Sequence, residues 1–205
     1  MRLGLLHTSP VHVTTFDALA AEEAPGVELV HVVRADLLAE ARERGPEAVA
    51  DRVADAVRDL STDAVLCTCS TIGAVAEGVD AGVPVLRLDR PMAAAAVATG
   101  GTVVVLAALE STLAPTLALL AEEADRAGTS PRIEATVVAG AWDRFEAGDV
   151  DGCLGLVRAA LEQVEDATVV VLAQASMAPA ADGAAVDLPV LSSPRTGLRA
   201  ALALE

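Results

Sequence analysis

The chain has 205 residues, with 14 basic and 30 acidic side chains and a formal net charge of −16. All the basic residues are arginine, because the sequence contains no lysine, and it contains no tyrosine either. These absences exclude a lysine Schiff base, a P-loop lysine and a tyrosine acid or base. The acidic composition with 1% aromatic residues also argues against nucleic-acid binding.

Short runs rich in valine and leucine alternate with longer segments of helical period, a pattern typical of an α/β fold with a parallel sheet covered on both faces. Hydrophobic residues make up 53% of the chain, enough for a full core. The expected strands are residues 2–7, 27–33, 64–68, 84–88, 102–107, 132–138, 168–173 and 189–192.

Amphipathic helices are expected at residues 46–60, 111–126 and 149–165. The longest uncharged run, residues 91–109, has membrane-spanning length, but a glycine pair interrupts its alanine-rich and valine-rich parts. We interpret it as a helix, a turn and a strand. The first ten residues have neither the apolar length nor the small-residue pattern of a signal peptide, so we expect a cytoplasmic protein that does not bind membranes.

An internal repeat aligns residues 64–97 with residues 169–202 without a gap. Cys69 falls on Gln174 and Arg90 falls on Arg195, each 105 residues apart. The repeat predicts two four-stranded α/β halves related by a pseudo-twofold axis. We place the first half at residues 1–95 plus a C-terminal helix at 194–205, the second half at 96–193, and a ligand cleft between them.

Polar side chains follow four of the expected strands and precede helices, where hydroxyl and helix N-terminal N–H groups suit a small anion such as a carboxylate. Serine and threonine are also ordinary helix caps, so each loop alone has a structural interpretation. The predicted substrate-binding residues are Thr8, Ser9, Ser70, Thr71, Ser111, Thr112, Gln174, Ala175 and Ser176.

The duplicated pattern and the Cys69-Ser70-Thr71 sequence resemble the aspartate/glutamate racemase superfamily over essentially the whole chain. The resemblance implies two pseudo-symmetric α/β domains, no cofactor, a small carboxylate or amino-acid-like substrate, and a dimer or larger homo-oligomer. It also implies two cysteines that exchange the α-proton. Cys69 matches the first, in a Cys-Asn-Thr motif, with serine replacing asparagine. Gln174 stands where the second is expected, in Gly-Cys-Thr.

The replacement of the second thiol by Gln174 bears on the reaction. Two-base racemisation needs a proton donor on each face of the substrate, whereas an amide offers only hydrogen bonds. We therefore expect a cofactor-independent isomerase or racemase-type enzyme. The alternatives are a one-thiol decarboxylase or lyase of the same superfamily and a non-catalytic carboxylate-binding protein.

Cys69 is the predicted acid, base or nucleophile, and we expect the helix N-terminus to bring its pKa from about 8.5 toward neutrality. Cys67 alternates with it on the strand and is expected in the core, as is Cys153. A metal site on Cys67 and Cys69 is a competing use of these thiols, but the histidines that would complete it are distant in sequence, and we expect no metal.

His7 ends the first strand and is the predicted second catalytic group, because imidazole titrates near neutrality. His12, in the following loop, is a weaker candidate, and His31 is expected to be an ordinary strand residue. Arg90 and Arg195 could each clamp a carboxylate or tie their half to the acidic surface, and we favour the second interpretation. Trp142 could line a pocket or pack in the core.

Overall fold

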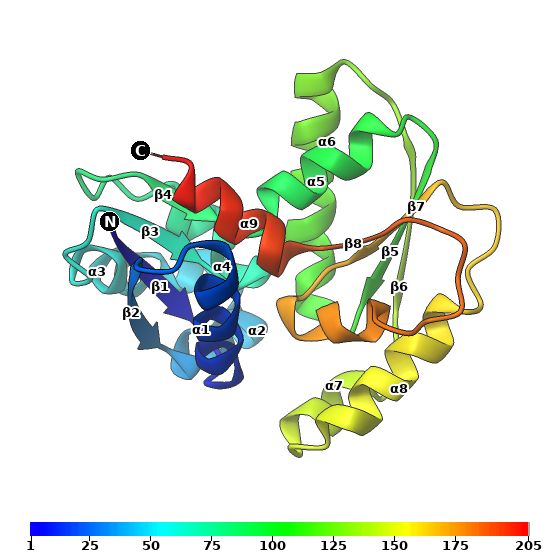
Figure 1. The fold of residues 1–205 in the computed structure, drawn as a ribbon, viewed down its shortest axis with the longest axis horizontal. Helices are drawn as coiled ribbons and strands as arrows, with labels where there is room; N and C mark the ends of the chain where they lie inside the picture. Colours follow the sequence, from blue (N-terminus) through cyan, green and yellow to red (C-terminus); the bar gives the residue numbers. More distant parts are fainter. Residues whose placement is uncertain (205) are drawn as a thin grey trace. The chain divides into compact units, whose positions relative to one another are not determined.

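The computed structural model describes residues 1–204, which form two compact units. The first contains residues 1–89 and the segment from Pro194 onward, and the second is Arg90–Ser193. Each unit holds one four-stranded parallel sheet, with strand orders β2-β1-β3-β4 and β6-β5-β7-β8 (Figure 1). The predicted α/β class with two four-stranded parallel sheets is confirmed.

The first unit contains all four strands in the expected places. They are β1 (Arg2–His7), β2 (Glu28–Val33), β3 (Ala64–Cys67) and β4 (Val85–Arg87). The predicted helix at 46–60 is divided into two parts, η1 and α3. The helices are α1 (Val11–Glu23), α2 (Ala35–Arg44), the 3-10 helix η1 (Pro46–Val49), α3 (Ala50–Arg58), α4 (Ser70–Glu77) and α9 (Ser193–Leu202).

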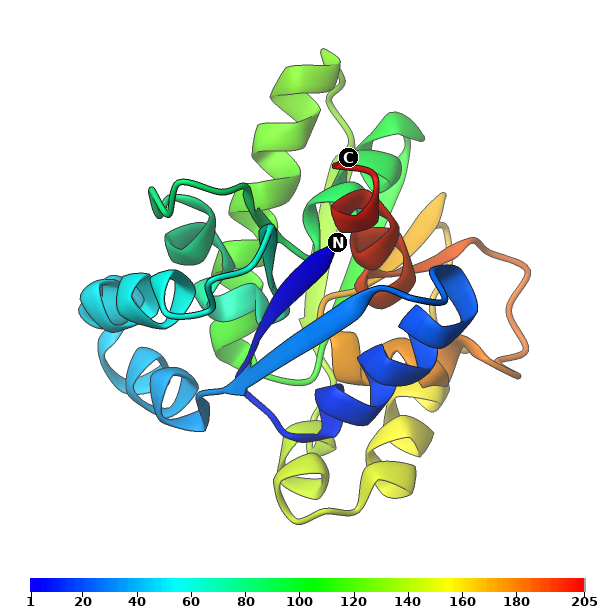
Figure 2. The same ribbon diagram turned by 60° about the vertical axis from the view of Figure 1, so that its left-hand side comes forward.

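Helices cover both faces of the first sheet. One face packs against α2, α3 and α4, where Leu6 and Val65 of the sheet meet Leu37, Val53 and Ile72 in one buried cluster. Because successive side chains of a strand point to opposite faces, the strand residues next to Leu6 and Val65 face the helices on the other side of the sheet. Figure 2 shows α1 and α9 on the opposite side of β1 and β2 from α2 and α3.

The second unit repeats this arrangement. Its strands are β5 (Thr102–Ala107), β6 (Arg132–Val137), β7 (Val169–Leu172) and β8 (Val190–Ser192). Its helices are α5 (Arg90–Ala98), the 3-10 helix η2 (Glu110–Thr112), α6 (Leu113–Ala127), α7 (Ala141–Glu146), α8 (Val150–Leu161) and the 3-10 helix η3 (Ala175–Ala181). The uncharged run 91–109 is helix, turn and strand, as predicted. None of the helices within residues 1–204 has the length and apolar character needed to span a membrane.

Strand register reproduces the sequence repeat. Within the first sheet Val65 pairs with Val85, and within the second their counterparts 105 residues later, Val170 and Val190, pair in the same way. The α-helix that follows β3 does not recur after β7 as expected. The counterpart of α4 is the 3-10 helix η3, which contains Pro179. Proline lacks an N–H and disrupts a regular α-helix at that position.

Helix α5 packs within the second unit, so the first unit ends at Asp89 and not at residue 95 as we had placed it. The reason is its apolar face: Met92, Ala96 and Val97 are buried in one cluster with β5, α6 and β7. Helix α9, by contrast, packs in the first unit, where a Cβ at Gly197 would overlap the carbonyl oxygen of Leu88. The helix after β4 and the helix after β8 are therefore exchanged between the units.

The repeated arginines make matching ion pairs on these exchanged helices. Arg90 of α5 pairs with Glu123 of α6 at 2.5 Å, and Arg195 of α9 pairs with Glu23 of α1. Both arginines thus anchor a helix to the acidic helix of its own unit, which is the interpretation that we favoured. The ring of Trp142 contacts that of Phe145 in a tilted arrangement, with ring centroids 5.2 Å apart, and packs against the core of the second unit.

Candidate functional site

Cys69 is the N-cap residue of α4, two residues after the end of β3. Its backbone is extended, which directs the chain out of the sheet and into the helix. The side chain is partly exposed, whereas the flanking Thr68 and Ser70 are buried. This position puts a thiol at the carboxyl end of a parallel strand, where ligands of open α/β sheets bind.

The pKa of the Cys69 thiol is raised above its ordinary value, chiefly by burial. The hydroxyl of Thr8 and the N–H groups of Ile72 and Thr71 approach the sulfur and act in the opposite direction, although the sulfur makes no capping hydrogen bond of regular geometry. The charge of Asp89 adds to the increase. The expected decrease toward neutrality is therefore wrong for this structure: burial outweighs the helix N-terminus, and Cys69 is a neutral thiol at pH 7.

A buried ion pair between Arg87 and Asp89 joins β4 to the loop that follows it. Arg87 donates from Nε to Asp89 Oδ1 at 2.7 Å and from Nη2 to Oδ2 at 3.0 Å. Both side chains are only 2% exposed. The bidentate contact neutralises two charges inside the protein and places a carboxylate close enough to influence both Cys67 and Cys69.

His7 is fully buried and both of its ring nitrogens have partners. Nδ1 lies 2.8 Å from Thr68 Oγ1, and Nε2 lies 2.8 Å from His31 Nδ1. Burial, with the nearby rings of His12 and His31, lowers the pKa of His7 to about 3. His7 is therefore neutral at pH 7, and both of its ring nitrogens contact protein groups. Neither of these contacts is one through which His7 could exchange a proton with a substrate. Its catalytic role stays a prediction.

The other histidines extend this cluster. His31 lies on β2, as expected, and its Nε2 contacts Asp17 Oδ1 at 3.1 Å. His12 was expected in a loop but lies in the first turn of α1, which begins at Val11. Its ring centroid is 6.1 Å from that of His7, and burial lowers its pKa to about 4. Within residues 1–204, no group of three or more His, Cys, Asp or Glu side chains is arranged to hold a metal ion.

In the second unit, Gln174 directly precedes η3. Its Oε1 accepts the N–H groups of Ala108 and Leu109 at 2.6 and 3.2 Å. The carbonyl end of the amide is thus used within the protein, and the amide nitrogen remains as the hydrogen-bond donor. On η2, the buried Oγ atom of Ser111 has no hydrogen-bond partner among the described residues.

Burial separates the predicted polar loop residues into two groups. The buried residues are Thr8, Ser70, Thr71, Thr112, Gln174 and Ala175. The partly exposed residues are Ser9, Ser111 and Ser176. Thr8 is the one of these whose side chain approaches the Cys69 sulfur. Sequence reasoning missed Asp17, Thr68 and the Arg87–Asp89 pair. The Arg-x-Asp spacing at the end of β4 was a usable signal, because an arginine and a carboxylate this close in sequence can form a bidentate ion pair.

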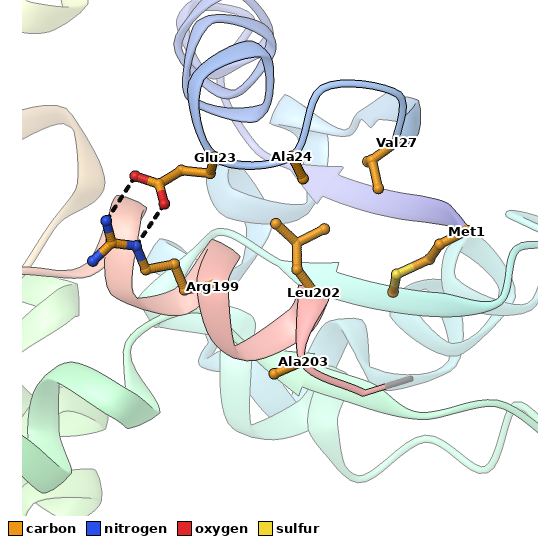
Figure 3. A pocket seen from close by; sticks show the side chains of 7 residues that line it. All are labelled: Met1, Glu23, Ala24, Val27, Arg199, Leu202 and Ala203. Carbon is orange, nitrogen blue, oxygen red and sulfur yellow. Dashed lines mark hydrogen bonds and ion pairs between the residues drawn. The ribbon is translucent and has the colours of Figure 1, made fainter.

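A shallow groove between α1 and α9 is lined by none of the predicted site residues. Figure 3 shows its floor of small and apolar side chains, including Val27 and Leu202, with the Glu23 carboxylate bound by Arg199 at one end. The two hydrogen bonds of that pair measure 2.6 and 3.0 Å. The groove follows from how α9 docks on α1.

The three cysteines differ enough in exposure for a chemical test. Cys67 is 1% exposed and Cys153 is 2% exposed, both in core clusters as predicted. We expect iodoacetamide to alkylate Cys69 first, at a rate that still increases at pH 9 because the thiolate is the nucleophile and the pKa of Cys69 is raised. Peptide mass spectrometry of timed samples checks this, and earlier labelling of Cys67 or Cys153 would contradict the assignment of the accessible thiol.

The two four-stranded parallel units have the fold of solved glutamate, aspartate and allantoin racemases. A glutamate racemase from Bacillus anthracis superposes with a TM-score of 0.72 at 17% identity, covering 98% of this chain and 80% of that one. The Picrophilus torridus aspartate racemase gives 0.72 at 13% identity, covering 94% and 89%. Allantoin racemase from Pseudomonas fluorescens gives 0.65 at 20% identity, covering 100% and 90%.

At these identities the likeness concerns the fold. No family model and no curated protein sequence matches the chain.

Proposed function

We propose that the protein is a cofactor-independent enzyme of the isomerase or racemase type that acts on a small carboxylate or amino-acid-like substrate through the Cys69 thiol. The observation that carries this proposal is the position of Cys69: a partly exposed thiol at the carboxyl end of β3, approached by the Thr8 hydroxyl and two backbone N–H groups. Structural likeness to racemases of glutamate, aspartate and allantoin supports the same class of reaction.

The proposed chemistry moves one proton at the α-carbon. When Cys69 acts as base, its thiolate takes the α-proton, the C–H bond breaks, and the electron pair is delocalised into the adjacent carboxylate as an enolate. When Cys69 acts as acid, the S–H bond breaks and the proton returns to the carbon. Protonation by solvent restores the thiol.

Anion binding is assigned to the polar loops of each unit, taken separately. In the first unit, the residues proposed to bind the anionic groups of a substrate beside Cys69 are Thr8, Ser9, Ser70 and Thr71. In the second unit, the residues proposed to bind an anion are Ser111, Thr112, Gln174, Ala175 and Ser176. Gln174 suits anion binding because its Oε1 is bound by backbone N–H groups, and its amide nitrogen is a hydrogen-bond donor. The dimer or larger assembly implied by the resemblance stays a prediction.

A one-thiol decarboxylase is a second candidate, and two observations favour it. Gln174 carries no exchangeable acid where a second thiol would be expected, and the raised pKa keeps Cys69 protonated. In that reaction the bond to the leaving carboxylate breaks, carbon dioxide departs with the electron pair left on the α-carbon, and Cys69 protonates that carbon from one face. A single donor suffices.

Deuterium incorporation tests the proposal. In D2O, we expect proton NMR to show loss of the α-proton signal from at least one member of a panel of amino acids and small dicarboxylates. Cys69→Ala should lower that rate by at least about 100-fold, the low end of what a positioned acid or base contributes. Disubstituted malonates in the same panel report decarboxylation through the appearance of a new α-proton or deuteron.

Cys153→Ala is the matched control, since it removes a thiol that is buried in the core of the second unit. It should leave the rate unchanged. Exchange that persists in Cys69→Ala would contradict the role of this thiol. Binding without exchange or decarboxylation across the whole panel would instead indicate a carboxylate-binding protein.

A further inference from the structure

A continuous hydrogen-bonded chain of side chains crosses the first unit from the turn that carries Cys69 to the surface. It runs from Thr68 to His7 at 2.8 Å, from His7 to His31 at 2.8 Å and from His31 to Asp17 at 3.1 Å. The first two members are buried, whereas the Asp17 side chain is 58% exposed. The chain therefore links solvent to the residue that immediately precedes Cys69.

When both histidines are neutral, the contact with Asp17 at the exposed end of the chain determines where each hydrogen lies. A carboxylate only accepts, so His31 donates from Nε2 to Asp17 and its Nδ1 must accept. His7 therefore donates from Nε2 to His31, and its own Nδ1 accepts the hydroxyl hydrogen of Thr68. Every hydrogen bond then points from the Cys69 turn toward the surface.

One added proton requires the opposite direction. In protonated His31 both nitrogens are donors, so its Nδ1–H faces His7 and the Nε2 of His7 must accept. Neutral His7 then carries its hydrogen on Nδ1 and donates it to Thr68. The total hydrogen count of His7 is unchanged, and the single extra proton, taken from solvent, resides on His31.

The structure contains a second acceptor for the displaced hydroxyl hydrogen. Thr68 Oγ1 lies 3.3 Å from the backbone oxygen of Leu6 on β1. When His7 donates to Thr68, the Thr68 hydroxyl can turn to this carbonyl without leaving its place. The chain therefore has two fully satisfied arrangements that differ by one proton at His31.

We propose that Thr68, His7, His31 and Asp17 form a reversible hydrogen-bond chain whose direction is set by the protonation of His31 and which adjusts the turn bearing Cys69. These are positioning residues. Their effect on catalysis rests on the proposed function, but the reversal itself does not. The Asp17 carboxylate contacts His31, and the His12 ring on α1 is the other titratable group beside His7.

Nitrogen-15 NMR of histidine-labelled, full-length protein tests the reversal directly, because protonated and unprotonated imidazole nitrogens have different shifts. At high pH we expect His7 to carry hydrogen on Nε2 only. As His31 takes up its proton, His7 should change to the Nδ1–H form while remaining neutral. Over the same pH interval, the alkylation rate of Cys69 should depart from a single-group titration curve.

Asp17→Asn gives a second measurement at an exposed residue, and asparagine keeps an accepting oxygen at this position. It should shift the midpoint of the reversal, because a neutral amide replaces the carboxylate that accepts from His31 Nε2. Asp51→Asn, on the exposed side of α3, removes the same charge away from the chain and should leave the midpoint in place.

An Nδ1–H form of His7 at high pH, or one nitrogen pattern throughout the titration of His31, would overturn the proposed chain. A reversal that leaves Cys69 alkylation on a single-group curve would overturn its positioning role. Neither result depends on turnover: failure of the deuterium-incorporation experiment would count against the proposed enzyme without affecting the nitrogen spectra.

Discussion

Lowering the pH from 6.5 to 4 should reduce the free energy of unfolding by about 6 kcal/mol through His7 and His12 alone. Their pKa values in the folded protein are about 3 and about 4, because both side chains are buried, against an ordinary value of 6.5. The unfolded chain takes up both protons near pH 6.5, whereas the folded chain takes them up only near pH 4 and below. The stabilisation is therefore complete above about pH 6.5 and is lost as the pH falls.

Urea unfolding followed by circular dichroism at several pH values measures this loss, with a limiting slope of about 2.7 kcal/mol per pH unit for two protons. His12→Leu should halve the slope between pH 6 and 5. Hydrogen exchange of β1 compared with β5 locates the effect, since both histidines lie in the first unit. Constant stability from pH 7 to 5 would show that these rings are not buried as neutral groups.

Asp89→Ala should lower the free energy of unfolding by about 3–5 kcal/mol, the cost of removing one partner of a buried ion pair. The variant leaves the Arg87 guanidinium, 2% exposed, without the carboxylate that holds it in two hydrogen bonds. It also removes a negative charge that raises the pKa of Cys69, so alkylation of any folded protein should shift to lower pH.

Asp36→Ala is the control, because Asp36 is 48% exposed in its pairs with Arg34 and Arg52. Such a pair contributes at most about 1 kcal/mol. Replacing both buried partners, as Arg87→Met with Asp89→Leu, should recover much of the stability lost in Asp89→Ala. Equal unfolding midpoints for Asp36→Ala and Asp89→Ala in urea would contradict this account.

The strands were predictable because their signal is local. The apolar runs at β1, β5 and β7 differ from the helical segments in period and length. Period and length can be read from the sequence without knowledge of the fold. The repeat was equally visible, since the pairing of Val65 with Val85 recurs as that of Val170 with Val190. A proline at position 179 was a visible reason to doubt a second regular helix.

The predictions about individual site residues were weaker, because burial and partner geometry decide them. Cys69 was correctly expected after β3, at the start of a helix. The direction of its pKa shift was not, since the helix N-terminus is apparent in the sequence but the extent of burial is not. Gln174 shows the same limit: its amide orientation depends on backbone N–H groups of another loop, 66 residues away.

By itself, the sequence determined the α/β class, the two copies of a four-stranded unit and the loops that carry polar residues, because periodicity and repetition are properties of neighbouring residues. Only the tertiary structure decided that α5 packs in the second unit, that Arg87 and Asp89 neutralise each other, and that His7 joins a chain to Asp17. These depend on contacts between distant segments, whose electrostatic and packing energies no local pattern contains.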